Sequence, residues 1–128
     1  MIKTFRGQIA DGGIDVVNIH TNNGEIGYRI IRFQIIGIDS SATSQESTVK
    51  IFTVPQTNVD STIDLSSQTL LAIAYRENYS GSNNSDPSEV IIFDKMVFNQ
   101  DLYITHDDAT DAGGCNYYFE LEQVKLDL

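Results

Sequence analysis

Several residue types are scarce or missing in this chain of 128 residues. Tryptophan is absent, cysteine occurs once, at Cys115, and there are two prolines. A single cysteine cannot form an intrachain disulfide, so we expect a fold that does not depend on oxidation. The lack of tryptophan and of a second cysteine argues against a true immunoglobulin domain, whose core carries a Cys–Trp–Cys pattern.

Positive charge is also scarce. Eight Lys and Arg residues stand against 18 Asp and Glu residues, which gives a formal net charge of −10. Binding to nucleic acid relies on clustered Lys and Arg beside the phosphates, so we expect no nucleic-acid partner. The acidic excess favours solubility and would steer the protein toward a basic partner surface. A solvated surface without any steering role explains the same charge equally simply.

Long hydrophobic runs are missing as well. No stretch approaches the roughly 18 apolar residues that a membrane helix needs, so we expect no membrane partner. The first residues, Met1–Gln8, lack the apolar run of a signal peptide. We therefore expect a protein made in a reducing cytoplasm. Its length predicts one domain, residues 1–128, large enough for a core of its own.

The segment Tyr28–Ile38 is the longest stretch dominated by β-branched and aromatic residues. Side chains on a strand point alternately to its two faces. One predicted face carries Ile31, Phe33 and Ile35. The other face is apolar around a polar centre: Tyr28, Ile30, Arg32, Gln34, Ile36 and Ile38. We predict a central strand with the first face in the core and the second partly covered.

Seven other segments have the composition of short strands separated by turn residues. They are Lys3–Ile9, Ile14–His20, Ser47–Val54, Thr69–Arg76, Glu89–Asp94, Leu102–Thr105 and Asn116–Leu126. A short helix is the alternative for Thr69–Arg76. The polar segments Asp39–Ser47, Gln56–Gln68, Glu77–Ser88 and Asp107–Gly114 are predicted loops. The pattern predicts an all-β fold, an antiparallel β-sandwich of about eight strands, most simply a jelly roll and otherwise an immunoglobulin-like sandwich.

The buried core is predicted to gather Phe33, Ile35, Phe93, Tyr117, Phe119 and Leu121. In the closing strand, Glu120 and Glu122 alternate with the inward set and should face out. The apolar side then switches at Val124 and Leu126, which indicates a bulge or a partner contact near the C-terminus.

Candidate catalytic and metal-binding residues are few. His20 and His106 are the only histidines, and we interpret both as turn residues, because no Cys or His spacing completes a zinc site with Cys115. Asp101, Asp107, Asp108 and Asp111 offer oxygen ligands, but the calcium-loop spacing of an EF-hand is absent. No Gly-x-Ser-x-Gly elbow and no phosphate-binding glycine loop occurs. We therefore predict no metal, no cofactor and no enzymatic activity.

Four segments carry a resemblance to a known family: Phe5–Gly12, Gly27–Ile31, Phe98–Thr105 and Asn116–Glu122. They resemble the small virion structural proteins encoded by marine tailed bacteriophages. The resemblance implies a component of the phage particle, and a small all-β form fits a capsid decoration (cement) protein that stabilises the head shell. It also implies a location in the virion, assembled in the host cytoplasm, with the major capsid protein as partner. No catalytic residues come with the resemblance.

Two alternatives to a decoration protein follow from the same sequence. One is another virion component, such as a tail, fibre or neck protein. The other is a carbohydrate-binding β-sandwich, for which exposed aromatic rings would be needed as platforms. Tyr75 and Tyr79, beside the polar segment Glu77–Ser88, are the candidates that the sequence offers.

Apolar residues outside the predicted core indicate an interface. We predict contacts with the shell and with other copies, in a homo-oligomer that is most simply a homotrimer, because exposed apolar surface tends to mark interaction sites. The predicted interface residues are Ile30, Arg32, Gln34, Ile36, Val124, Leu126 and Leu128.

Overall fold

The computed structural model describes residues 1–19, 24–38, 44–79, 88–109 and 113–126. These residues form eight β-strands and no helix, which confirms the predicted all-β class. The strands are β1 (Ile2–Ile9), β2 (Ile14–Val17), β3 (Ile26–Gly37), β4 (Ser44–Phe52), β5 (Leu70–Tyr79), β6 (Ser88–Phe93), β7 (Leu102–Asp108) and β8 (Cys115–Lys125). The described ranges contain no helix that could span a membrane. The segment Thr69–Arg76, for which a short helix was the alternative, lies largely in β5 and is therefore a strand.

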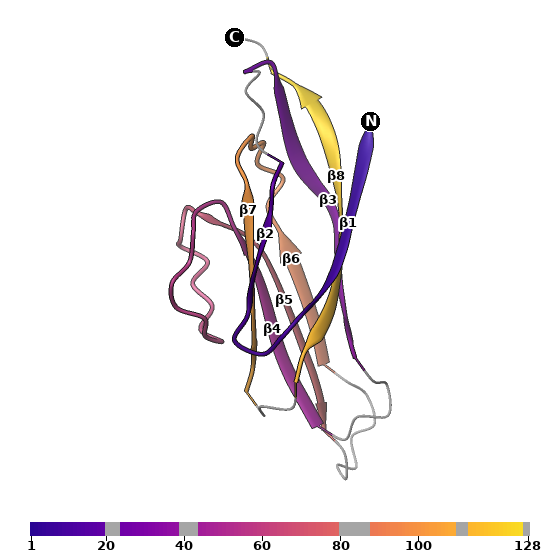
Figure 1. The fold of residues 1–128 in the computed structure, drawn as a ribbon, viewed down its shortest axis with the longest axis vertical. Coiled ribbons are helices and arrows are strands. Elements are labelled where there is room, and N and C mark those ends of the chain that lie inside the picture. Colours follow the sequence, from indigo (N-terminus) through magenta and orange to yellow (C-terminus); the bar gives the residue numbers. More distant parts are fainter. Residues whose placement is uncertain (20–23, 39–43, 80–87, 110–112, 127–128) are drawn as a thin grey trace.

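The strands form two antiparallel sheets, which face each other as the layers of a sandwich (Figure 1). The three-stranded sheet has the order β1-β8-β3, and the five-stranded sheet has the order β2-β7-β4-β5-β6. The pairs β1–β8, β2–β7 and β4–β5 fit a jelly roll, in which a fourth nested pair would join β3 and β6. β6 instead pairs with β5, so the sandwich is confirmed and the jelly-roll arrangement is not.

The predicted central strand is an edge strand of its sheet. β3 lies at one side of the three-stranded sheet, and β8 lies in the middle, paired with β1 on one side and β3 on the other. The prediction was wrong because the composition of a strand indicates how far its side chains are buried. The number of neighbouring strands depends instead on pairing between segments distant in sequence. Both strands are long and apolar on their inner faces, so composition does not distinguish them.

A β-bulge in β3 changes which residues face the core. The pairing with β8 shifts between Ile30 and Arg32, so that Ile31 has no cross-strand partner. An extra residue of this kind reverses the alternation on one side of it. Ile30 therefore faces the core with Phe33 and Ile35 and is 0% exposed. The prediction that Ile30 lies on the outer face, with Ile36, was wrong for this reason.

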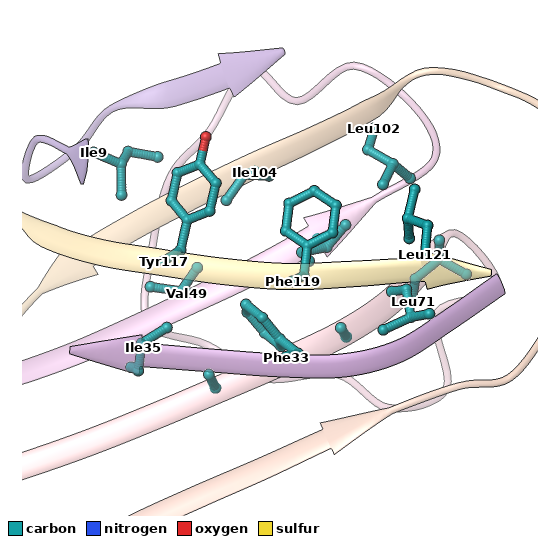
Figure 2. Close-up of a cluster of buried hydrophobic side chains, with 14 of the residues drawn as sticks. Ile9, Phe33, Ile35, Val49, Leu71, Leu102, Ile104, Tyr117, Phe119 and Leu121 are labelled. Atoms are coloured by element: carbon teal, nitrogen blue, oxygen red, sulfur yellow. The ribbon is translucent and has the colours of Figure 1, made fainter. Parts of the chain in front are cut away.

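The core lies between the two sheets (Figure 2). Phe33, Ile35, Tyr117, Phe119 and Leu121 are buried in it together, as predicted, and Phe93 packs against it while partly exposed. The rings of Phe119 and Tyr117 lie 6.1 Å apart, between their centroids, in a stacked arrangement. The alternation of β8 is regular over this stretch, because Cys115–Leu121 pairs in continuous register with β1.

β6 was predicted to be a brief buried strand, and it is instead the edge of the five-stranded sheet. Ile91 and Phe93 pack against the core. Val90 and Ile92 point to the opposite face of the sheet, and each is 47% exposed. A run of four apolar residues does not reveal by itself whether one or both faces of the strand are covered.

Several strands extend into segments that were predicted to be loops. β4 begins at Ser44, within Asp39–Ser47, and β5 continues to Tyr79, where it pairs with Ser44. β7 continues to Asp108, which pairs with Ser47. The polar composition of these stretches concealed the strands, because ladder hydrogen bonds use the backbone and need no apolar side chain. Among the other predicted loop residues, 39–43, 80–87 and 110–112 lie outside the described residues, as does His20.

The predicted irregular segment Gln56–Gln68 is confirmed as part of the connection between β4 and β5. This connection projects from the five-stranded sheet on the side away from the three-stranded sheet (Figure 1). Lys50 lies on the outer face of β4 and is 6% exposed. Its ammonium group donates hydrogen bonds to Asp60 Oδ1 at 3.0 Å and to the Thr62 carbonyl at 2.8 Å. These bonds hold the segment against the outer face of the sheet.

Candidate binding surfaces

The seven predicted interface residues do not form one patch. Arg32, Gln34 and Ile36 lie together on the outer face of β3, and Ile36 is 64% exposed. Ile30 belongs to the core. The other three residues are the C-terminal set: Val124 and Leu126 are half-buried, and Leu128 lies outside the described residues.

Leu126 packs on its own chain. A Cβ atom at Gly27 would lie 2.7 Å from Val97 Cγ1 and 3.3 Å from Leu126 Cδ2, so the absence of a side chain at Gly27 leaves room for both. Gly27 also pairs with Val124 in the ladder between β3 and β8. The apolar residues at the end of β8 are therefore partly covered within the chain. Of the two explanations that the sequence offered there, the pairing of β8 with β3 shows no bulge at Val124, and the partner contact stays a prediction.

The outer face of the three-stranded sheet is mainly polar, and most of its charges are paired. Arg29 Nη2 lies 2.8 Å from Glu122 Oε1, and Arg32 Nη1 lies 3.9 Å from Glu120 Oε2. The Arg32 guanidinium also lies over the Tyr118 ring, 5.7 Å from its centroid. The Tyr118 hydroxyl donates to Glu120 Oε2 at 2.5 Å, and this bond raises the pKa of the phenol. Such contacts fix the tyrosine ring on the surface.

A groove of about 480 Å³ crosses this face near the end of the sheet where β8 begins. Its lining comes from all three strands: Arg6, Gly7 and Gln8 of β1, Gln34, Ile35 and Ile36 of β3, and Asn116, Tyr117 and Tyr118 of β8. Gly7 lines the groove with its backbone, and on the inner face its small size leaves room for Tyr117, because a Cβ there would lie 2.6 Å from the Tyr117 hydroxyl oxygen. The groove holds amide, guanidinium and phenol groups on a rigid sheet, an arrangement suited to binding a ligand.

Apolar side chains gather on the opposite side of the molecule. Val90 and Ile92 project from the outer face of β6, and Leu65, from the connection between β4 and β5, is 66% exposed. Leu65 and Ile92 line a common depression of about 240 Å³. We call Leu65, Val90 and Ile92 the apolar strip. Exposed apolar side chains that adjoin one another are typical of a surface that contacts another protein.

His106 is not a turn residue, as the sequence suggested, but a fully buried member of β7. Its Nδ1 lies 3.3 Å from the Ala10 carbonyl oxygen, and its Nε2 lies 3.0 Å from Ser47 Oγ. This pair resembles the nucleophile and base of a hydrolase in its atoms, but both residues are buried in the sandwich. A substrate cannot reach Ser47 without unfolding of the sheet. The neighbouring Cys115 is also buried, and burial raises the pKa of its thiol to about 11.

The carboxylates considered as calcium ligands have structural partners. Asp101 Oδ1 accepts a hydrogen bond from the Ile19 backbone N–H at 3.0 Å. Asp108, fully buried at the end of β7, accepts one from the Glu46 backbone N–H at 3.2 Å. Asp107 lies in the same strand, and Asp111 lies outside the described residues. Within the described ranges, no three His, Cys, Asp or Glu side chains gather closely enough to hold a metal ion.

The two tyrosines that the sequence offered as a sugar-binding platform stay a prediction. The Tyr75 hydroxyl donates to Glu77 Oε2 at 2.6 Å, and the Tyr79 side chain lies outside the described residues. Tyr118 lines the groove instead. The signal for Tyr118 was present in the sequence, because it alternates with the inward residues Tyr117 and Phe119. The rest of the groove was not predictable, since Arg6 and Gln34 meet Tyr118 only through the β1-β8-β3 pairing.

Comparison with protein-family models, curated proteins and solved structures found no match to this chain.

Proposed function

We propose that the protein is a structural component of a bacteriophage particle, a head decoration protein that binds and stabilises the outside of the capsid shell. The resemblance of four segments to phage virion proteins supports this function, and a small all-β sandwich is a suitable form for it. The role is not catalytic. The burial of Ser47 and His106, the one Ser–His pair described above, supports that part of the proposal.

The observation that carries the proposal is the apolar strip. Leu65, Val90 and Ile92 expose more apolar surface on one side of the sandwich than a solvent-facing edge requires. The opposite face is mainly polar apart from Ile36, and its Arg32 and Glu120 are already paired with each other. We therefore assign the contact with the major capsid protein to the strip. On a shell, many weak contacts of this kind add up through avidity, so no single patch need be large.

Copies of the protein are proposed as the second partner. A homotrimer fits the local three-fold positions of a capsid, because a closed ring repeats the same pair of patches on every subunit. Sedimentation velocity of the purified protein gives the oligomeric state directly. A monomer in solution that still binds shells would remove the trimer from the proposal and leave the decoration role in place.

Co-sedimentation with shells of the encoding phage that lack this protein tests the decoration role. The wild-type protein should pellet with the shells. Ile92→Lys should weaken binding by at least about tenfold, because it places a charge in the apolar contact. Ile36→Lys is the matched control, since it places the same residue at an exposed position on the opposite sheet, and it should bind normally.

Three outcomes would contradict the proposal. Failure of the wild-type protein to bind shells would refute the decoration role. Equal losses for Ile36→Lys and Ile92→Lys, or a loss for Ile36→Lys alone, would show that the strip is not the contact. A map of the whole particle that places the protein on the tail, fibre or neck would identify it as part of that component and would refute the location on the head.

A further inference from the structure

The groove on the three-stranded sheet has unused hydrogen-bond donors. Gln8 Nε2 donates to Asn116 Oδ1 at 3.2 Å, and Arg32 Nη2 donates to Gln34 Oε1 at 3.2 Å. In the described part of the chain, these bonds occupy the amide oxygens of Asn116 and Gln34 and leave their NH₂ groups for a ligand. Arg6, which also lines the groove, has no ion-pair partner among the described residues.

Acceptors are few at the same place. None of the nine lining residues is an Asp or a Glu. The nearest carboxylate along β8, Glu120, is engaged by Tyr118 and Arg32. A groove with spare N–H donors and a guanidinium complements a ligand rich in oxygen atoms that carries a carboxylate, because Arg binds carboxylates in a bidentate, charge-assisted manner.

An aromatic ring lies among these donors. Tyr118 lines the groove, and its hydroxyl bond to Glu120 and its contact with Arg32 hold the ring in one orientation. The C–H face of a pyranose ring packs well on such a surface. Ile36 adds an apolar wall beside it. A volume of about 480 Å³ is within the range of small-ligand sites.

We propose that this groove binds an acidic polysaccharide, with a uronate carboxylate on Arg6, a sugar ring on Tyr118 and hydroxyl oxygens on the NH₂ groups of Asn116 and Gln34. An acidic peptide satisfies the groove less well, because its backbone N–H groups need several acceptors, and the side-chain amide oxygen that the lining has to spare is that of Gln8. The site lies on the sheet opposite the apolar strip. A protein seated on a shell by the strip would therefore present the groove outward, but the proposal does not depend on the shell contact.

The chain as a whole repels polyanions, with its net charge of −10. The groove face differs locally, because three of the eight cationic residues, Arg6, Arg29 and Arg32, lie on it. Two of these are paired with glutamates, so Arg6 supplies the uncompensated charge. Binding of a uronate should therefore weaken with salt, and it should depend on Arg6 more than on the other two arginines.

Titration of the ¹⁵N-labelled protein with trigalacturonate, followed by NMR, tests the site. Backbone shifts should be confined to β1, β3 and β8 around the groove, with shifts of the Asn116 and Gln34 side-chain NH₂ groups. The neutral galactose trisaccharide of the same linkage should bind about tenfold more weakly, because it lacks the carboxylate. Triglutamate, the acidic peptide probe, should bind no better than the neutral sugar.

Three variants assign the roles. Arg6→Gln should lower the affinity for trigalacturonate to that of the neutral sugar, while Tyr118→Ala should remove binding of both. Arg29→Gln is the matched control, because Arg29 lies on the same face outside the groove and is paired with Glu122; it should bind as the wild type does. Dispersed NMR spectra show that each variant is folded.

Four results would overturn the proposal. They are no trigalacturonate shifts at millimolar concentration, shifts centred outside the groove, an unchanged affinity in Arg6→Gln, and triglutamate binding as tight as trigalacturonate binding. The last result would identify the groove as a site for acidic peptide. None of these results depends on shell binding, so the two proposals fail or stand separately.

Discussion

Replacement of Ile30 and of Ile36 by alanine tests the β3 bulge. Strict alternation puts both isoleucines on one face, whereas the bulge places Ile30 in the core and leaves Ile36 64% exposed. Ile→Ala removes three carbons, worth about 2.5 kcal/mol of transfer free energy when fully buried. A residual cavity raises the total to roughly 3–5 kcal/mol at Ile30. At Ile36 about a third of the side chain is covered and no cavity forms, so the loss should be about 1 kcal/mol or less.

Urea unfolding followed by far-UV circular dichroism measures the difference. With an m-value of about 2 kcal/mol per molar urea, Ile30→Ala should lower the midpoint by roughly 1.5–2.5 M and Ile36→Ala by less than about 0.5 M. The lower β-propensity of alanine affects both variants and cancels in the comparison. Should Ile30→Ala fail to fold, Ile30→Val and Ile36→Val provide the same comparison at about 0.5–1.5 kcal/mol for the buried site. Equal midpoint losses at the two positions, or a larger loss at Ile36, would refute the bulge.

Three further predictions concern local contacts. Gly7→Ala should destabilise the protein by about 1–3 kcal/mol, because the new Cβ would lie 2.6 Å from the Tyr117 hydroxyl oxygen. Melting temperatures should show that Tyr117→Phe recovers part of this loss in the double variant. Strictly additive effects of the two substitutions would contradict the clash. The hydrogen bond from Lys50 lowers the pKa of the exposed Asp60 carboxyl. The Lys50–Asp60 bond therefore stabilises the folded state above the unfolded-state pKa of about 3.9, and this stabilisation is lost as pH falls through the lower folded-state pKa. Asp60→Asn should remove the contribution of this bond to the acid dependence of the unfolding free energy. An unchanged pH profile would count against the bond. Cys115, buried and with its thiol pKa raised to about 11, should resist a thiol reagent at pH 8 in the native protein and react fully in urea, whereas rapid native labelling would show that the site opens.

The all-β sandwich and most of its core were predictable from the sequence. Period-two alternation identifies Phe33, Ile35, Phe119 and Leu121 as inward residues, and local polarity identifies the long connection between β4 and β5. These features depend on near neighbours in the chain. The burial of an apolar side chain follows from the side of the strand on which it lies, and that side repeats every two residues.

Tertiary structure decided the features that depend on pairing. The bulge at Ile31 arises from the register of β3 against β8, about 90 residues further along the chain, and it moved Ile30 from the predicted interface into the core. The pairing of β8 with both β1 and β3 joins Arg6, Gln34 and Tyr118 in one groove. Burial of His106 also follows from its place between β2 and β4. A sequence records which residues are apolar or polar, but the cross-strand partner of each residue is set by contacts among distant segments, and those contacts determine the binding surfaces.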